Sequence, residues 1–189
     1  MSNPKVLAFA GSIRRDSYNK QLVNVAKNSV EKLGAEVTFV DLHDFQMPLY
    51  CDDLYKKDGM PENAIAFKKL MKSHNGFLIA SPEYNGSLTG ILKNTIDWAT
   101  IRHDNEERNA CFNEKIAAIM CAAPGIGGSR GMHHLRMVLS SLGTFVLPKH
   151  LCVTNCHAHL QDNTALEDDT QQRIDSMASE LVRIISRLH

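Results

Sequence analysis

A loop that combines an aromatic ring, an amide and free backbone groups lies within residues 81–98. It opens with Ser-Pro-Glu-Tyr-Asn-Gly at Ser81 and follows Phe77–Ala80, an apolar run typical of a strand buried in a parallel sheet. Apolar residues after the loop recur with helical spacing as far as Ile96. Ligands bind at the carboxyl ends of strands in open α/β sheets. The loop therefore predicts a site for a planar ligand with polar edges, a description that a flavin fits.

A second segment, Gly11–Asn19, suits a phosphate group. It joins a predicted strand to a predicted helix, so backbone N–H groups and the positive end of the helix dipole converge there. Ser12, Ser17 and Asn19 offer donors and Arg14 offers a positive charge, which together suit the terminal phosphate of FMN. The alternative is that Ser17 only caps the helix and Arg14 is solvated. The segment lacks a Walker ending and a Gly-x-Gly-x-x-Gly pattern, which disfavours a nucleoside triphosphate or tightly held NAD.

Both segments resemble motifs of the NADPH-dependent FMN reductase family, which includes quinone, azo-dye and chromate reductases with a flavodoxin-like fold. Pro82–Asn85 and Gly90–Trp98 resemble the family's flavin loop and the helix after it, and Gly11–Asn19 resembles its phosphate loop. The resemblance implies bound FMN, with NADPH or NADH as the hydride donor. It also implies that the isoalloxazine is held, largely by main-chain groups, by Pro82, Glu83, Tyr84 and Asn85. Taken alone, Glu83 also fits a solvated or salt-bridged loop residue, and Tyr84 fits ordinary packing.

A third glycine-rich segment, Gly125–Gly131, follows the fourth predicted strand and opens a helix. As a dinucleotide loop it is a weak match, because it falls in the fourth unit rather than the first. We interpret it as a third wall of the flavin site, since it resembles the family's Gly-Gly-x-Arg turn. Family members often have hydroxyl residues just upstream, whereas Cys121–Pro124 has none. This difference leaves the backbone groups of Ala123 and Gly125 to bind the edge of the isoalloxazine.

The resemblance implies an enzyme, an NAD(P)H-dependent FMN or quinone reductase. The hydride chemistry belongs to the cofactor, so we assign no catalytic side chain. If donor and acceptor use the same open face in turn, turnover is ping-pong, and quinones, azo compounds, flavins and metal oxyanions such as chromate are expected acceptors. His133, His134, Arg130 and Arg136 either border this pocket or are solvated, with a partner subunit as a further alternative for the two histidines.

Two other functions stay open. One is a flavodoxin-like electron carrier that holds FMN without accepting hydride from NAD(P)H, and the other is a redox-sensitive interaction module. Carriers are usually acidic for docking on redox partners, whereas this chain has 21 Lys+Arg against 21 Asp+Glu. The balanced charge therefore argues against the carrier.

Length and composition predict a single domain over residues 1–189 with no nucleic-acid partner, because the formal net charge is +0. The N-terminus runs straight into an apolar strand, so we expect a cytoplasmic protein with no membrane partner.

The 5 cysteines fit reduced thiols better than a disulfide framework. Cys152–His159 crowds potential zinc ligands, but no second cluster completes a site. We expect no metal, and a late strand with its turn that leaves His157 and His159 exposed.

Strand and helix patterns alternate along the chain and predict an α/β fold. Strands are expected at Val6–Ala10, Val37–Val40, Phe77–Ala80, Ile116–Cys121 and, interrupted, Phe145–Leu147 with Leu151–Val153. Helices are expected at Leu22–Leu33, Asn63–Lys72, about Ser87–Ile101, Ser129–Leu142 and Ile174–Leu188. The simplest arrangement is a flavodoxin-like doubly wound five-stranded parallel sheet of order 2-1-3-4-5, with helices on both faces.

Family members commonly form dimers or tetramers in which the helix that carries Trp98 meets another subunit. The resemblance therefore implies a homodimer or homotetramer. The alternative for Trp98 is burial in the core of its own chain.

Overall fold

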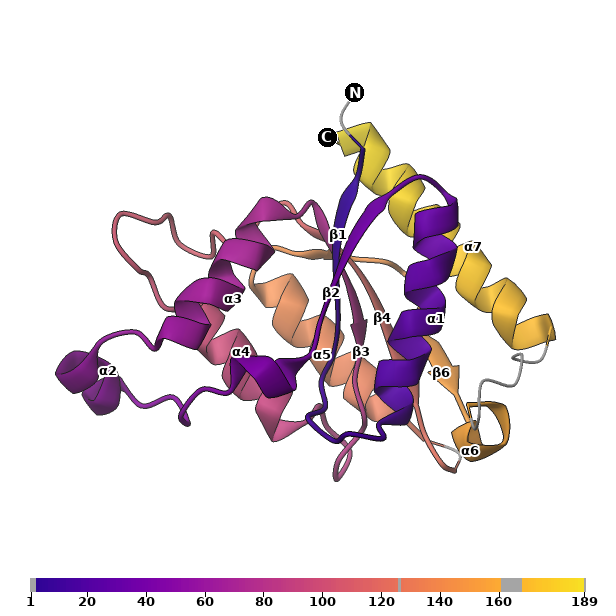
Figure 1. Ribbon diagram of the computed structural model, residues 1–189, viewed down its shortest axis with the longest axis horizontal. Coiled ribbons are helices and arrows are strands. Elements are labelled where there is room, and N and C mark those ends of the chain that lie inside the picture. The colour runs from indigo at the N-terminus through magenta and orange to yellow at the C-terminus, as the bar shows by residue number, and fades with distance from the viewer. Residues whose placement is uncertain (1–2, 126, 161–167, 189) are drawn as a thin grey trace.

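A computed structural model describes residues 3–125, 127–160 and 168–188. Its centre is a parallel sheet in the order β2-β1-β3-β4-β5, with β6 also paired to β4 (Figure 1). The strands are β1 (Lys5–Ala10), β2 (Glu36–Val40), β3 (Gly76–Ala80), β4 (Ile116–Ala122), β5 (Phe145–Val146) and β6 (Leu151–Val153). The predicted flavodoxin-like order 2-1-3-4-5 is confirmed.

The interrupted fifth strand is two short strands that pair with different parts of β4. β5 lies beside Ile116 and Ala117, whereas β6 lies beside Met120–Ala122. Pro148 stands between them, and a proline has no N–H to donate to a ladder. The edge of the sheet is therefore broken where the sequence predicts an interruption.

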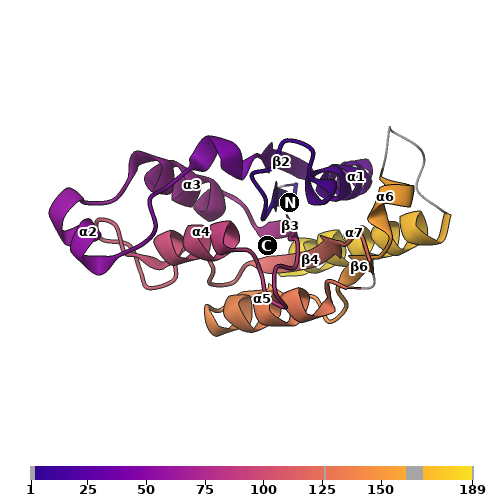
Figure 2. The same ribbon diagram turned by 90° about the horizontal axis from the view of Figure 1, so that it is seen from below.

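Helices cover both faces of the sheet (Figures 1 and 2). The sequence-predicted helices are α1 (Tyr18–Lys32), α3 (Glu62–Ser73), α4 (Gly90–Thr100), α5 (Ser129–Ser141) and α7 (Asp168–Leu188). Alternate residues of β1 divide between two cores: Val6 and Ala8 pack with α1 and α7, and Leu7 and Phe9 pack with α3, α4 and α5. The alternation follows from the two-residue period of a strand.

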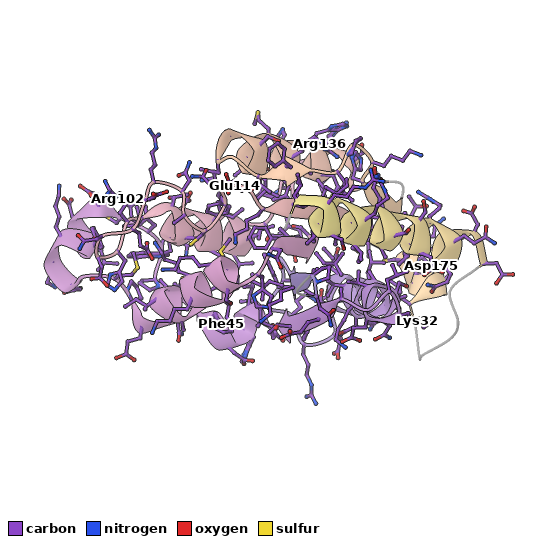
Figure 3. The ribbon with its side chains drawn as sticks, turned by 90° about the horizontal axis from the view of Figure 1, so that it is seen from above. Lys32, Phe45, Arg102, Glu114, Arg136 and Asp175 are labelled. Carbon is purple, nitrogen blue, oxygen red and sulfur yellow. The ribbon has the colours of Figure 1, made fainter. Side chains whose placement is uncertain are left out.

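The pairing of α1 with α7 also has a polar component. The Ser29 hydroxyl donates to Asp175 Oδ1 at 2.6 Å, and Figure 3 shows Asp175 on α7 along the side of the molecule where α1 carries Lys32. Within the described residues, no helix combines the length and the apolar character that crossing a membrane requires.

Three short helices have no counterpart among the predicted elements: η1 (Leu42–Phe45), α2 (Asp52–Asp58) and α6 (Cys156–His159). α2 has no buried residue and stands away from the sheet (Figure 1), so it lacks the apolar periodicity by which a packed helix is recognised. Two acidic residues begin it and two lysines end it, which suits its dipole. The Tyr55 hydroxyl donates to the carbonyl of Arg102, and Figure 3 labels Arg102 next to this helix.

Candidate functional site

The loops after β1, β3 and β4 lie next to one another at the carboxyl edge of the sheet, at the lower end of Figure 1. The amide of Gly11 donates to the carbonyl of Ala80 at 2.8 Å, and the amide of Ser81 donates to that of Met120 at 2.9 Å. The strand order reverses direction between β1 and β3, which is where doubly wound sheets hold their ligands. The structure therefore brings the three sequence-predicted segments together.

Gly11 begins the first loop in a tight packing position. A Cβ on this residue would lie 2.8 Å from Ser81 Oγ and 3.0 Å from Leu92 Cδ2. Thr89 caps α4 by accepting from the amide of Leu92, and its hydroxyl donates to the carbonyl of Gly11 at 2.7 Å. The start of the phosphate loop is thus pressed against the flavin loop and the start of α4.

The N-terminus of α1 has no side-chain cap within the described residues. Ser17 is its N-cap residue and is buried, but its hydroxyl caps no amide among the described residues. The first turn of α1 also contains no acidic residue. Exposed Arg14 lies nearby, with its guanidinium donating to the Asp16 carbonyl at 3.2 Å, while buried Ser12 accepts from the Arg14 amide at 3.3 Å. Backbone amides, hydroxyls and a cation together suit a phosphate.

The side chain of Asn19 points to β4. Its Oδ1 accepts from the Ala122 amide at 2.9 Å, and its Nδ2 donates to the Ala122 carbonyl at 3.0 Å. Asn19 therefore braces α1 against the strand that leads into the third loop. That Asn19 donates to a phosphate stays a prediction. The donor would be its second Nδ2 hydrogen or its backbone amide.

The flavin loop contains a two-residue hairpin turn. Tyr84 and Ser87 exchange backbone hydrogen bonds of 2.9 and 3.1 Å, and Asn85 and Gly86 between them have φ of 52° and 78°. Asn-Gly is the pair that such a left-handed turn favours. The helix predicted from about Ser87 consequently begins only at Gly90. The turn leaves the Tyr84 side chain 51% exposed at the carboxyl edge of the sheet.

Glu83 joins the second and third loops. Its Oε2 accepts from the amide of Gly131 at 2.8 Å, in the first turn of α5. The Glu83 carboxylate is therefore neither simply solvated nor salt-bridged, the two alternatives considered from the sequence. It binds a backbone amide of α5 instead.

Ala123 and Gly125 differ in what they can offer a ligand. The Ala123 amide donates to the Val153 carbonyl at 2.9 Å, and its carbonyl accepts from the Cys156 amide at 3.0 Å. Gly125 is exposed, with open space where a Cβ would lie. The Ala123 amide is therefore already bonded to β6 and its carbonyl to α6, whereas Gly125 remains accessible.

The thiols beneath this loop are poor nucleophiles. Burial raises the pKa of Cys121 to about 12, with a further increase from Cys152, and burial also raises the pKa of Cys152. Because the thiolate is the reactive form, these groups stay protonated near neutral pH.

The two histidines and two arginines of α5 separate into two groups. His134 and Arg130 lie at the flavin loop, where His134 Nδ1 is 3.0 Å from Ser87 Oγ and Arg130 Cδ is 3.7 Å from an ideal Cβ on Gly86.

His133 and Arg136 instead hold the segment between β5 and β6. Arg136 donates to the carbonyls of Val146 and Pro148 at 3.2 Å, and the ring of His133 packs edge-on against that of His150 with centroids 5.1 Å apart. Burial, together with His133 and Arg136, lowers the pKa of His150. Sequence spacing alone does not distinguish these two groups.

Trp98 is fully buried in its own chain. Its Nε1 donates to the Pro48 carbonyl at 2.7 Å, and its ring meets Tyr50 edge-on with centroids 5.1 Å apart. Asn94 Oδ1 accepts from the Tyr50 amide at 2.8 Å, and its Nδ2 donates to the Pro48 carbonyl at 3.0 Å. The Lys-Asn-Thr-Ile-Asp-Trp run thus anchors the segment that leads into α2, a role that no local pattern in the sequence indicates.

The Cys152–His159 segment forms β6, a turn and the one-turn helix α6, with His157 exposed as expected. The His159 side chain falls outside the described part of the structure. Among the residues that are described, no three potential ligands gather into a metal site. The expectation of no metal stays a prediction.

Comparisons with known proteins agree on one family. Residues 4–158 match the model of the family described as NADPH-dependent FMN reductase. A potato protein named NAD(P)H:quinone oxidoreductase is 33% identical over 97% of this chain and 94% of its own length. An NAD(P)H-dependent FMN reductase of Pseudomonas aeruginosa is 32% identical, covering 97% of this chain and 96% of that protein.

Other matches cover different shares of the chains. A rice protein named probable NADPH:quinone oxidoreductase 2 is 40% identical over 71% of this chain, but the match spans 63% of the rice protein's length. Among solved structures, the flavoenzyme NAD(P)H:(acceptor) oxidoreductase FerB from Paracoccus denitrificans superposes with a TM-score of 0.79 at 27% identity, covering 97% of this chain and 98% of FerB.

Proposed function

Because the chain belongs to the NADPH-dependent FMN reductase family, we propose that it binds FMN and passes reducing equivalents from NADPH or NADH to quinones. The observation that carries this proposal is the arrangement of two loops. The loop that leads into α1 starts at Gly11, whose amide bonds to the Ala80 carbonyl just before the Pro82–Asn85 loop, at the switch point of the sheet.

The residues at this edge fit the cofactor. Ser12, Arg14 and Ser17, with backbone amides at the start of α1, hold the phosphate. The main-chain groups of Pro82–Asn85 that the Tyr84–Ser87 turn leaves free, together with those of Gly125, bind the isoalloxazine. Asn19 and Ala123 act mainly by fixing the strands and helices that carry these loops, because their polar groups already bond to neighbouring backbone.

FMN, when bound, supplies the acceptor for hydride and the donor for the second substrate. The chain's own residues orient the reactants and require no proton-transferring side chain. Glu83, the carboxylate in the flavin loop, is held by the Gly131 amide and is not a general base. Half-exposed Tyr84 offers an aromatic surface at the rim, where a flat acceptor can stack.

A site that offers stacking more than directed hydrogen bonds discriminates weakly among acceptors. We therefore extend the proposal to azo compounds, free flavins and metal oxyanions such as chromate, in a ping-pong sequence with the nicotinamide. Assembly as a homodimer or homotetramer also stays a prediction, and the mass of the purified protein in solution tests it.

The first experiment is the visible spectrum of the purified protein before and after anaerobic addition of NADPH. Flavin bands that bleach promptly, and return when benzoquinone is added, support the proposal. Flavin bands that neither NADPH nor NADH bleaches would favour the electron carrier instead. A colourless protein that cannot be reconstituted with FMN would overturn the proposal.

A further inference from the structure

We propose that Glu83 is a positioning residue: its carboxylate occupies the N-terminus of α5 and so fixes the flavin loop after β3 against the loop after β4. The proposal rests on the proposed function for its effect on FMN, whereas the contact itself is a feature of the structure. Three features of the molecule support it.

The first feature is that α5 provides no cap of its own. Its N-cap residue is Gly128, with no side chain to accept a hydrogen bond, and its first turn contains no acidic residue. The first described helical hydrogen bond runs from the Met132 amide to the Gly128 carbonyl, at 3.1 Å. The Gly131 amide thus precedes that ladder, and Glu83 Oε2 accepts its hydrogen at 2.8 Å. A carboxylate at this place also meets the positive end of the helix dipole.

The second feature is the close approach of α5 to the flavin loop. A Cβ on Gly131 would lie 3.2 Å from Glu83 Cβ, 3.3 Å from Glu83 Cγ and 3.3 Å from the Ser87 carbonyl oxygen. A side chain at position 131 would therefore require Glu83 or the loop to shift by about a few tenths of an ångström. One turn later, His134 Nδ1 lies 3.0 Å from Ser87 Oγ. Residues three apart share a face of a helix, so both ends of the 83–87 loop are attached to one face of α5.

The third feature is the contrast with α1. Both helices follow loops at the same edge of the sheet, and both have N-termini that attract anions. At α5 the anion is the chain's own Glu83. At α1 no acidic side chain and no side-chain cap occupies the end, within the described residues. Because Glu83 occupies the N-terminus of α5, the N-terminus of α1 is the one left for a ligand phosphate, within the described residues. Glu83 also joins the loop after β3 to the loop after β4.

The experiment compares wild-type protein with Glu83→Ala, Glu83→Gln and Glu83→Asp. One readout is hydrogen exchange of the Gly131 amide in the apoprotein, and the other is the Kd of FMN from fluorescence quenching. Losing a helix cap of this kind changes an equilibrium constant by roughly five- to tenfold, here the opening of the Gly131 amide and the Kd of FMN. We expect that change in both readouts for Glu83→Ala.

Glu83→Gln and Glu83→Asp separate the effect of side-chain length from the effect of the negative charge. Glutamine keeps the acceptor at the same length, so Glu83→Gln should stay within about threefold of wild type. Aspartate keeps the charge but is one methylene shorter, so Glu83→Asp should behave like alanine. Glu62→Ala is the matched control, because Glu62 is an exposed carboxylate in the first turn of α3, and neither readout should change.

Gly131→Ala approaches the contact from the other side. Alanine is the better helix former, so the thermal midpoint need not fall, yet its methyl group should displace Glu83 and weaken FMN binding by a similar factor. This variant keeps the proposal testable if Glu83→Ala does not fold.

Two results would overturn the proposal while leaving the proposed function intact: FMN affinity and Gly131 exchange unchanged in Glu83→Ala, or Glu83→Gln as impaired as Glu83→Ala. If wild-type protein does not bind FMN at all, the proposed function fails. Gly131 exchange in the apoprotein then decides separately whether Glu83 holds α5.

Discussion

The Asn19 side chain forms two hydrogen bonds with one residue, accepting from the Ala122 amide at 2.9 Å and donating to the Ala122 carbonyl at 3.0 Å. The two residues are 103 positions apart in sequence, and both are buried. Through this pair the first turn of α1 is fixed to the end of β4. The position of the phosphate loop therefore depends on a strand that lies two places away in the sheet.

Asn19→Ala should destabilise the protein by roughly 2–4 kcal/mol, because it leaves the buried amide and carbonyl of Ala122 without partners. The Kd of FMN should rise by about tenfold or more, since α1 would no longer be fixed beside the third loop. Chemical denaturation and FMN titration measure the two effects. Asn24→Ala, at an exposed position of the same helix, should change neither. Equal behaviour of the two variants would contradict this role of Asn19.

Two glycines near the site should respond in opposite ways to alanine. In Gly11→Ala the new methyl group would meet Ser81 Oγ at 2.8 Å and Leu92 at 3.0 Å, so the phosphate loop must move and FMN binding should weaken by at least about tenfold. Gly90 begins α4 with open space around its Cβ position. Gly90→Ala should leave FMN affinity unchanged and stabilise the fold by up to about 1 kcal/mol. Fluorescence titration and thermal unfolding of both variants check this pair of outcomes.

Asn94→Ala should loosen the segment that leads into α2. It removes the hydrogen bonds to the Tyr50 amide and the Pro48 carbonyl, while the bond from Trp98 to Pro48 remains. Limited trypsin digestion, followed by mass spectrometry, should show faster cleavage after Lys56 and Lys57 than in wild type.

The control for that experiment is Lys93→Ala, which removes a neighbouring side chain of α4 that makes only a surface ion pair with Asp97. Its cleavage rate should match that of wild type. If Asn94→Ala is digested no faster than this control, the anchoring role of Asn94 is wrong.

Glu106 makes stability dependent on acid. Burial alone would raise the pKa of its carboxyl, but hydrogen bonds from Lys68 and Lys72 outweigh burial and lower the pKa from 4.5 to about 2. A lowered pKa contributes stability above the unfolded value of 4.5 and loses it as the pH falls toward 2. The contribution at neutral pH is on the order of 3 kcal/mol, since the pKa is lowered from 4.5 to about 2 and one pKa unit corresponds to about 1.4 kcal/mol.

In Glu106→Gln this dependence should disappear. The variant should be less stable at pH 7, because Lys68, whose side chain is 4% exposed, loses its partner, and the difference from wild type should shrink between pH 4.5 and 2. Free energies of unfolding at several pH values measure it. Glu31→Gln removes an exposed carboxylate paired with Lys27 and should have little effect at any of them. A difference between wild type and Glu106→Gln that stays constant with pH would contradict the prediction.

The sequence by itself determined the strands, the five long helices and the order of the sheet. Uninterrupted apolar runs such as Phe77–Ala80 have few alternatives to a buried parallel strand, and right-handed crossovers then leave few arrangements of five such strands. Pro148 also marks the break in the fifth strand, because the lack of an N–H is a local property. α2 escaped prediction, since its seven residues bury nothing and its helix leaves no apolar pattern to detect.

Only the tertiary structure decided what each polar side chain bonds to. Asn19 and Glu83 both lie in motifs that predict contact with a cofactor, yet Asn19 bonds to Ala122 and Glu83 to Gly131, far along the chain in each case. His133 and His134 are neighbours in sequence but point to different loops, because successive helical residues face different directions. A hydrogen bond requires two distant segments to be placed to within about a few tenths of an ångström, and local spacing in the sequence does not encode that placement.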